Sequence, residues 1–414
     1  MDHASSWEAA ARLLAEHRDV LEGRPDEGRV PAALEARGWA AWLLALDDDA
    51  LTALEVHGHE ARWPTGAPPS LLALASAAQS VCALPSSSLA SLASAGSAGL
   101  PRAAKRGETP RKRAQIEAFA RVVAPLAGAA KRVIDVGSGH GHLTRDIAER
   151  IAVPVVGLER DATLANRAQE LSSPSSSPPS FAVTDVLRDG LALDASDCVI
   201  GLHACGELGD AMVESVARAG ASLALVGCCL QKRRSPSRRP LCDGFDLDLP
   251  KSLLGLSNLT ARDDGVEATR SENLAARERR LALHRLLAAE VGELRLGAEI
   301  EGLNRRAAHR DLDVLVARAF AVRGLPSPSA TVIREAESWA ASHHARARRL
   351  ALPRALLARP LEVFVLLDRA RYLEARGFEV DLLTLFPPAV SARNLALVAS
   401  RRRSAACELP FRNR

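Results

Sequence analysis

Apolar residues in the first part of the chain recur every three to four positions. They do so at Leu13, Leu14, Val20, Trp39, Trp42, Leu43, Leu46, Leu71, Leu72 and Leu74. This spacing places the side chains on one face of a helix. The pattern therefore predicts a helical N-terminal domain over residues 1–85.

A different pattern follows, in which short, continuous apolar runs alternate with helix-like segments. The predicted strands are Arg132–Val136, Pro154–Leu158, Phe181–Thr184, Asp197–Leu202 and Ser222–Gly227. Parallel strands buried on both faces have this continuous apolar character, because helices cover both sides of their sheet. The alternation predicts an α/β fold with a Rossmann-like parallel sheet.

The remaining segments complete this domain, which we place at residues 105–405. Residues 86–104 are rich in Ser, Ala and Gly and predict a linker, and Ser172–Ser180 predicts an exposed loop. Residues 231–355 return to a helical pattern and predict an insertion. A helix over Pro360–Arg376 then precedes two strands, Glu379–Phe386 and Asn394–Ser400, expected as an antiparallel hairpin at the sheet edge. The fold class is therefore α/β, with a Rossmann-like seven-strand sheet, a helical N-terminal domain and a helical insertion.

Composition adds limits on location and partners. The 414 residues carry a net charge of +4, and arginines cluster at Lys232–Arg239, Arg346–Arg359 and Arg401–Arg403. Such clusters are usually solvated faces, although they also permit contact with RNA. Seven cysteines make no disulfide framework, the N-terminus lacks the apolar core of a signal peptide, and charges interrupt every Leu-rich run. We expect a soluble cytoplasmic protein that does not contact the membrane.

The segment VIDVGSGHGHL carries the clearest chemical signal. A predicted strand ends near Asp135 and is followed by Gly137, Ser138, Gly139 and Gly141 before a helix begins. Glycines let the backbone turn tightly and approach a ligand, and the helix start offers free N–H groups to an anionic group. We expect these residues to bind a nucleotide-like cofactor.

Two acids at the ends of the next strands identify the cofactor more closely. Glu159 lies 18 residues beyond Gly141, where a nucleotide-binding sheet places an acid on the ribose hydroxyls. Asp185 follows the third strand and is predicted to take the adenine amino group. The spacing G-x-G-x-G and the acid Asp135 disfavour a dinucleotide, whose pyrophosphate the acid would repel. They favour S-adenosylmethionine, whose ammonium group tolerates it.

Residues after the fourth and fifth predicted strands are candidates for the acceptor side. His203 is the first candidate for a general base and also lies near the cofactor, with a loop-shaping histidine as the alternative. Cys205 with either Cys228 or Cys229 matches the positions of the two thiols used by RNA cytosine-C5 methyltransferases, although the neighbouring proline is absent. A zinc site from these residues lacks a CxxC pair, so we assign no metal.

Other features narrow the acceptor without identifying it. LHACG stands where N6-adenine methyltransferases carry an Asn/Asp-Pro-Pro-aromatic motif, which disfavours that chemistry. Tyr372 is the only tyrosine and lies in a late predicted helix, so an aromatic platform for a flipped base is weakly supported.

The runs KRVIDVGSGHGHLTRDIA, GLHACGELGDAM and VGCCLQK, together with the segment from LLARPLEVF to ALVAS, resemble the methyltransferase-like protein 25 family. That family includes the ribosomal RNA adenine dimethylase domain-containing proteins. The resemblance extends over nearly the whole chain, and it implies a methyltransferase of unspecified acceptor. Gln115 stands where the family tends to have His, which puts a role of that helix in acceptor binding in doubt.

The resulting hypothesis is an S-adenosylmethionine-dependent methyltransferase whose acceptor is RNA or protein, such as a ribosomal protein, rather than a small molecule. The alternative is a non-catalytic cofactor-binding scaffold that docks on RNA or the ribosome through its arginine-rich surface. The oligomeric state is not predicted.

Overall fold

The computed structural model describes residues 2–25, 29–84, 87, 89, 108–172, 178–261, 268–304 and 306–401. The chain forms two compact units, which we treat separately. The sheet unit comprises residues 1–15, 81–261 and 358–414, and the helical unit comprises residues 16–80 and 262–357. Most of the predicted linker 86–104 and the middle of the predicted loop Ser172–Ser180 lie outside the described residues.

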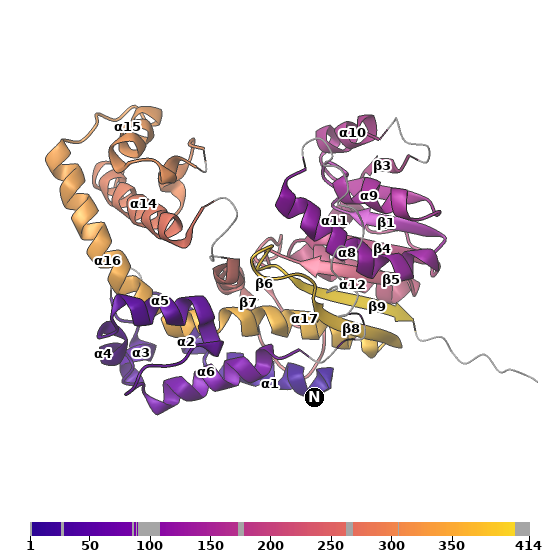
Figure 1. Cartoon of the computed structure of the whole chain (residues 1–414), viewed down its shortest axis with the longest axis horizontal. Coiled ribbons are helices and arrows are strands. Elements are labelled where there is room, and N and C mark those ends of the chain that lie inside the picture. The colour runs from indigo at the N-terminus through magenta and orange to yellow at the C-terminus, as the bar shows by residue number, and fades with distance from the viewer. Residues whose placement is uncertain are drawn as a thin grey trace, which may run out of the picture. The chain divides into compact units, whose positions relative to one another are not determined.

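The sheet unit is built on a seven-stranded sheet of order β3-β2-β1-β4-β5-β9-β8 (Figure 1). Its strands are β1 (Arg132–Val136), β2 (Val155–Glu159), β3 (Ser180–Val183), β4 (Asp197–Ala204), β5 (Ser222–Gly227), β8 (Phe378–Thr384) and β9 (Leu395–Arg401). The first five are parallel, whereas β9 runs antiparallel to both β5 and β8. The predicted Rossmann-like fold class is confirmed, and so is the terminal hairpin at the sheet edge.

Buried apolar side chains explain why the central strands form where they do. The middle strands β4 and β5 are buried over most of their length, as expected for strands covered on both faces. Alternate residues face opposite sides: Cys198 and Ile200 of β4 join one core with Phe119 and Ile147, whereas a Cβ at Gly201 would lie 2.8 Å from Met212 Cε. Each strand of this layer therefore contributes to two cores.

Helices form the outer layers. The helices α8 (Pro110–Gly128) and α9 (His142–Arg150) pack on the face that carries Cys198, and α12 (Glu207–Ala219) packs against β4 and β5 from the other side. The remaining helices are α10 (Ala162–Glu170) beside β2 and β3, α11 (Val186–Asp189), α17 (Ala358–Glu374) against β8 and β9, and the N-terminal α1 (His3–Glu16). The start of α8 follows from its sequence, because Thr109 Oγ1 accepts from Lys112 N–H and Pro110 occupies the first turn.

The segment after β5 stays with the sheet unit. Short strands β6 (Ser237–Arg238) and β7 (Leu249–Pro250) pair antiparallel, and α13 (Lys251–Leu254) and the 3-10 helix η3 (Gly255–Ala261) follow. The segment from β6 to η3 lies within the predicted helical insertion, residues 231–355. The structure instead groups the remaining insertion helices with the N-terminal helices in one compact unit.

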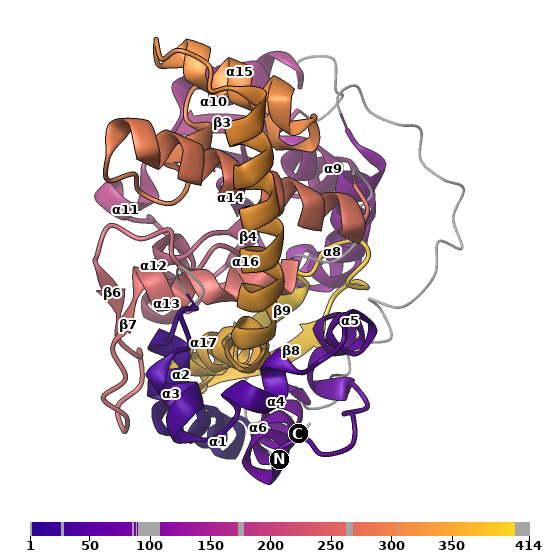
Figure 2. The ribbon, with the colours of Figure 1, turned by 90° about the vertical axis from the view of Figure 1, so that its left-hand side faces the viewer.

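The helical unit consists of short helices from the N-terminal part and long helices from the insertion. They are α2 (Arg18–Glu22), α3 (Ala32–Ala36), α4 (Ala40–Leu44), α5 (Asp48–His57), η2 (Gly58–Glu60), α6 (Pro69–Cys82), α14 (Arg270–Val291), η4 (Ala298–Ile300), η5 (Ala307–His309), α15 (Leu312–Val322) and α16 (Ala330–Leu356). The long helices α14 and α16 pack together, and α16 also contacts α4 and α5 (Figure 2). Glu55 pairs with both Arg270 and Arg348, which joins the two sequence segments. In the described part of the chain, no helix is long and apolar enough to cross a membrane.

Candidate cofactor site and acceptor edge

The glycine loop after β1 has a backbone that only glycine adopts easily. Gly137, Gly139 and Gly141 have φ values of 75°, 55° and 70°, and side chains disfavour this left-handed region. The three glycines differ in surroundings. A Cβ on Gly141 would lie 2.5 Å from the Phe181 ring, whereas a Cβ on Gly139 would have no heavy atom within 4 Å. Gly141 therefore serves packing, and Gly139 borders open space.

Asp135 lies beneath this loop and is buried. Its Oδ2 accepts a hydrogen bond of 2.7 Å from Thr144 Oγ1 on α9. Burial raises the pKa of Asp135 to about 6, against the lowering effects of Thr144 and Lys112. Such a carboxylate gains from a cationic ligand, because a positive charge offsets the cost of ionising it in a buried position.

Glu159, at the end of β2, faces the same loop. One carboxylate oxygen accepts from Gly139 N–H at 3.0 Å and the other from Asp161 N–H at 3.0 Å. The carboxylate is thereby held beside the open space at Gly139. Its role in binding ribose hydroxyls stays a prediction.

Ser138 supplies the evidence that a polar ligand fits here. Its side chain is buried, and its Oγ has no hydrogen-bond partner among the described residues. A buried hydroxyl without a partner is costly, so a ligand that satisfies it would be favoured. The open space at Gly139, the Glu159 carboxylate and the Ser138 hydroxyl together fit a polar cofactor.

Asp185 is less available to an adenine amino group than its position in the sequence suggests. It caps α11 through a bond from Leu187 N–H to its Oδ1, and its Oδ2 lies 2.5 Å from Arg234 Nη2. Arg234 is exposed. An adenine amino group would share an oxygen that already accepts a hydrogen bond.

His203 sits on a distortion at the end of β4. The pairing of β4 with β5 shifts register between Leu202 and Ala204, and His203 is the only non-glycine residue in the described ranges with a left-handed φ, 69°. Such backbones persist where the surroundings fix them, often at functional sites. Its ring Nε2 lies 3.1 Å from Gln115 Oε1 on α8. Gln115 therefore contacts the site, a role the sequence analysis does not assign to it.

The ring of His203 is neutral at physiological pH. Burial and, to a smaller extent, the positive charges of Arg111, Lys112 and Arg393 together lower its pKa to about 4. The prediction that His203 is a general base rests on an ordinary imidazole, which titrates near working pH. In this environment the ring accepts a proton less readily, although its neutral form keeps a free acceptor nitrogen.

The cysteines predicted at the strand ends come together. Cys205 and Cys228 form a disulfide with a Cα–Cα distance of 4.9 Å, and the Sγ of Cys229 lies within 4.8 Å of both sulfurs. Cys229 is a free thiol. A disulfide sulfur is not a nucleophile, so the thiol-adduct mechanism requires the reduced form.

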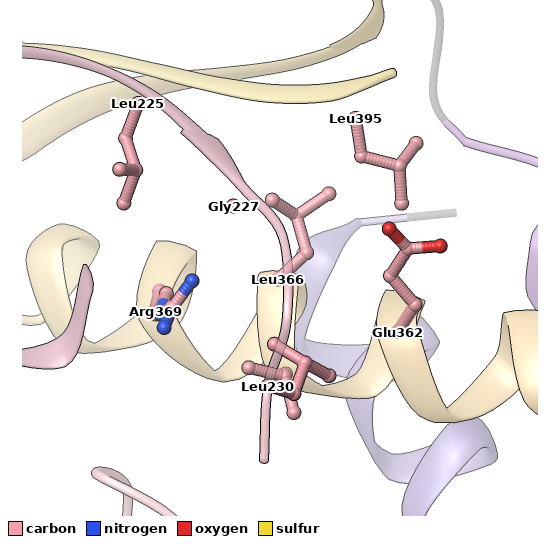
Figure 3. Close-up of a pocket in the computed structure, with 8 residues that line it drawn as sticks. Leu225, Gly227, Leu230, Glu362, Leu366, Arg369 and Leu395 are labelled. Carbon is pink, nitrogen blue, oxygen red and sulfur yellow. The ribbon is translucent and has the colours of Figure 1, made fainter. Parts of the chain in front are cut away.

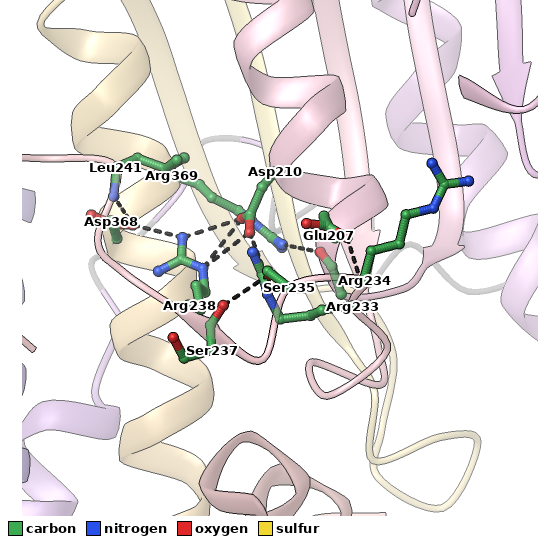
Figure 4. A network of polar contacts seen from close by, with 11 residues as sticks. Glu207, Asp210, Arg233, Arg234, Ser235, Ser237, Arg238, Leu241, Asp368 and Arg369 are labelled. Atoms are coloured by element: carbon green, nitrogen blue, oxygen red, sulfur yellow. Dashed lines mark hydrogen bonds and ion pairs between the residues drawn. The ribbon is translucent and has the colours of Figure 1, made fainter. Parts of the chain in front are cut away.

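A buried ionic network joins α12 and α17 to the segment after β5 (Figure 4). Asp210 on α12 accepts from Arg233 at 2.7 Å, from Arg238 at 3.1 Å and from Arg369 at 2.9 Å. Arg238 also pairs with Asp368 at 2.6 Å. The prediction that the Lys232–Arg239 run is a solvated face is wrong for Arg233 and Arg238, because both side chains are buried against carboxylates. The charges of Arg238 and Arg369 keep the pKa of Asp210 below its ordinary value despite its burial.

A small cavity lies where β5 and β9 meet α17 (Figure 3). It is lined by Leu225, Gly227, Leu230, Glu362, Val365, Leu366, Arg369 and Leu395. Its two charged residues already have partners: Arg369 binds Asp210 and Glu362 binds Arg359. The lining is otherwise apolar, so the cavity is best described as a packing gap at the carboxyl end of β5.

Part of the chain is similar to a known protein family. Residues 111–235 match the family model described as Methyltransferase domain. The matched stretch begins in α8, includes the glycine loop, Glu159 and His203, and ends after the cysteines.

Three solved structures of methyltransferases have some similarity to the chain. Magnesium protoporphyrin IX methyltransferase from Synechocystis PCC 6803 is 20% identical, with a TM-score of 0.24, covering 30% of this chain and 66% of that one. The 23S rRNA methyltransferase ErmE is 15% identical (TM-score 0.23, coverage 56% and 96%), and coclaurine N-methyltransferase is 10% identical (TM-score 0.27, coverage 85% and 90%). This chain spans slightly less than two thirds of the length of the Synechocystis enzyme. With TM-scores below 0.5, these similarities carry no argument about this chain.

Proposed function

We propose that the chain is an S-adenosylmethionine-dependent methyltransferase acting on an RNA or protein acceptor. The observation that carries this proposal is the glycine loop after β1. Its backbone is left-handed at Gly137, Gly139 and Gly141, and Glu159 is fixed by a hydrogen bond from Gly139 N–H. The loop lies at the carboxyl end of a parallel sheet, where such folds bind their ligands.

The residues of the loop suit the amino-acid end of the cofactor. Asp135 is a buried carboxylate whose ionisation a cationic ammonium would favour, and the Ser138 hydroxyl offers an unused hydrogen bond. The start of α9 presents N–H groups that attract a carboxylate. When bound, S-adenosylmethionine supplies an electrophilic methyl group on a sulfonium.

The nucleoside end would meet two acids. Glu159 keeps lone pairs free to accept from ribose hydroxyls while its bonds to Gly139 and Asp161 fix its position. Asp185, at the end of β3, would accept from the adenine amino group beside Arg234. Glu159 ends β2, which pairs with β1, and Asp185 follows β3, which pairs with β2, so both lie along the same edge of the sheet.

The acceptor side would be formed by residues after β4 and β5. His203 accepts or positions an acceptor proton through its free ring nitrogen, and the loops carrying Cys205, Cys228 and Cys229 surround it. Arg111, Lys112 and Arg393 place positive charge close to His203. Positive charge at this edge supports an anionic macromolecule as the acceptor, such as RNA or an acidic segment of a ribosomal protein.

The family and the cellular location of the protein belong to the same proposal. The HACG and GCC motifs support membership in the methyltransferase-like protein 25 family, and the small number of cysteines supports a cytoplasmic location. The alternative function is a non-catalytic scaffold that binds the cofactor and docks on RNA or the ribosome. It shares the cofactor site, so binding alone does not separate the two, whereas turnover does.

Cofactor binding provides the first test. We expect S-adenosylmethionine to bind the wild-type protein and Glu159→Gln to bind it roughly 10–100-fold more weakly, since hydrogen bonds to a charged acceptor contribute about 1.5–3 kcal/mol. Isothermal titration calorimetry measures both. Glu170→Gln is the matched control, because Glu170 lies exposed on α10 in a surface pair with Arg167. Equal affinity in Glu159→Gln and wild type would remove Glu159 from the cofactor site.

A further inference from the structure

Three cysteine sulfurs converge at the carboxyl ends of β4 and β5. The Sγ atoms of Cys205, Cys228 and Cys229 all lie within 4.8 Å of one another. We propose that the reduced form of this cluster is a binding site for a soft divalent cation, with Zn²⁺ as its first candidate. The proposal goes beyond the methyltransferase function, which does not require a metal.

Backbone contacts hold the two cysteine-bearing loops together independently of any bond between sulfurs. Glu207 N–H donates to Lys232 O at 3.1 Å, and the Glu207 carboxylate accepts from Arg234 N–H at 2.6 Å. A Cβ on Gly206 would lie only 2.0 Å from Lys232 O, so glycine permits this close approach. Within the second loop, Lys232 N–H donates to Cys229 O at 2.9 Å. The sulfurs therefore stay near one another when reduced.

The distances suit a tetrahedral thiophilic ion. With Zn–S bonds of about 2.3 Å, two thiolates on one zinc lie about 3.8 Å apart. Sulfurs confined within 4.8 Å reach that spacing by small side-chain rotations. Three protein thiolates leave one coordination position open, which a water or another donor would take. The carbonyl oxygen of His203 is the nearest protein candidate, since it lies 3.2 Å from Cys205 Sγ and 3.3 Å from Cys228 Sγ.

The surrounding charge complements such a site. Three thiolates and one Zn²⁺ carry a net charge of −1. The adjacent network holds three arginines against two carboxylates, Asp210 and Asp368, and so carries one excess positive charge. Arg369 from this network reaches the loops directly: its Nη2 donates to Gly206 O at 3.0 Å. The buried arginines thus favour an anionic metal–thiolate group beside them.

The disulfide and the metal site are alternative states of one cluster. In the structure Cys205 and Cys228 are bonded to each other, and a bonded sulfur does not donate a hydrogen bond to the His203 carbonyl. A phosphine reductant gives two electrons to the disulfide and becomes a phosphine oxide, while water supplies the oxide's oxygen and the two protons of the resulting thiols. Binding of Zn²⁺ then displaces the thiol protons of the three cysteines to solvent.

The experiment measures metal content and ligand identity on the full chain. Protein without an affinity tag is reduced with a phosphine under anaerobic conditions, titrated with Zn²⁺ against a chromophoric chelator, and separately loaded with Co²⁺. We expect one Zn²⁺ per chain and a sulfur-to-cobalt charge-transfer absorption. Cys205→Ser, Cys228→Ser and Cys229→Ser are each expected to weaken Zn²⁺ binding at least 100-fold, more than the roughly 10–100-fold typical of second-shell changes.

Cys242→Ser is the matched control. Cys242 is a free cysteine whose thiol donates to Asp368 O, a bond that serine retains, and burial raises its pKa to about 11. Cofactor affinity is measured for every variant, so that a misfolded protein is recognised and a failed methyltransferase proposal is seen separately. The proposal would be overturned if the protein bound Zn²⁺ but its Co²⁺-loaded form showed no sulfur-to-cobalt charge-transfer absorption. It would also be overturned if Zn²⁺ bound equally well to wild type and Cys229→Ser. Reduced, cofactor-binding wild-type protein that takes up no Zn²⁺ would overturn it as well.

Discussion

Gly139 and Gly141 lie two residues apart in the glycine loop but have different surroundings, so the substitutions Gly139→Ala and Gly141→Ala offer a sharp test of the cofactor site. Both residues have left-handed backbones, at φ 55° and 70°. Alanine in that region costs about 1–2 kcal/mol at either position. Only Gly141 has a second cost, because its added Cβ would lie 2.5 Å from the Phe181 ring and 3.0 Å from Ala168 Cβ. Overpacking of this kind costs about 1–3 kcal/mol.

The two variants should therefore separate stability from binding. We expect Gly139→Ala to lose about 1–2 kcal/mol of unfolding free energy and Gly141→Ala about 2–5 kcal/mol. The methyl group of Gly139→Ala would enter the open space beside Glu159. It should weaken S-adenosylmethionine binding at least tenfold, equivalent to about 1.4 kcal/mol. Gly141→Ala should lose less affinity while still folded, because its methyl group points into the Phe181 contact.

Urea denaturation followed by circular dichroism measures the stability of each variant, and calorimetry at low temperature measures its affinity. Wild-type affinity in Gly139→Ala would show that the cofactor does not occupy the space at Gly139. Equal stability of the two variants would refute the packing role assigned to Gly141. Either result would contradict a specific part of the reasoning, because the two measurements respond to different contacts.

Further predictions concern the buried charges. Because burial raises the pKa of Asp135 to about 6, its contribution to the stability of the cofactor-free protein is fully present below about pH 4, and about 3 kcal/mol is lost as the pH rises from there through 6. Asp135→Asn should abolish this loss, seen as a higher urea midpoint than wild type at pH 8 but not at pH 4, and should weaken cofactor binding. Asp210→Asn should cost about 3–5 kcal/mol at pH 7, because it leaves three buried arginines without their shared carboxylate. Thermal unfolding checks this against Asp189→Asn, an exposed acid expected to change stability by less than about 0.5 kcal/mol. Gln115→Leu should lower turnover more than cofactor affinity, since it removes the partner of the His203 ring; steady-state kinetics beside calorimetry measures both.

The strands of the sheet were predictable because burial on both faces leaves a continuous apolar run. The predicted and observed bounds of β1 and β5 agree, and those of β2 differ by one residue at each end. The glycine loop and Glu159 were predictable for a related reason. Their chemistry depends on local spacing along the chain, and the topology of a parallel sheet then brings the strand ends to one edge.

Features that depend on distant residues were not predictable. Gln115 and His203 meet across 88 positions, and Arg369 reaches Asp210 from a helix far along the chain. An arginine in a basic run has the same local pattern whether it is solvated or buried against a carboxylate, so Arg238 gave no signal. The grouping of residues 16–80 with 262–357 likewise depends on packing between segments that are separate in sequence.

Transfer of a tritiated methyl group from S-adenosylmethionine tests directly whether the protein is a methyltransferase. Extract from cells lacking the protein serves as acceptor, and wild type is compared with Glu159→Gln and the control Glu170→Gln. Nuclease and protease digestion then assigns the label. We predict tritium in RNA or protein with wild type and Glu170→Gln, and strongly reduced tritium with Glu159→Gln. Cofactor binding by wild type without any transferred label would contradict this prediction and favour the scaffold.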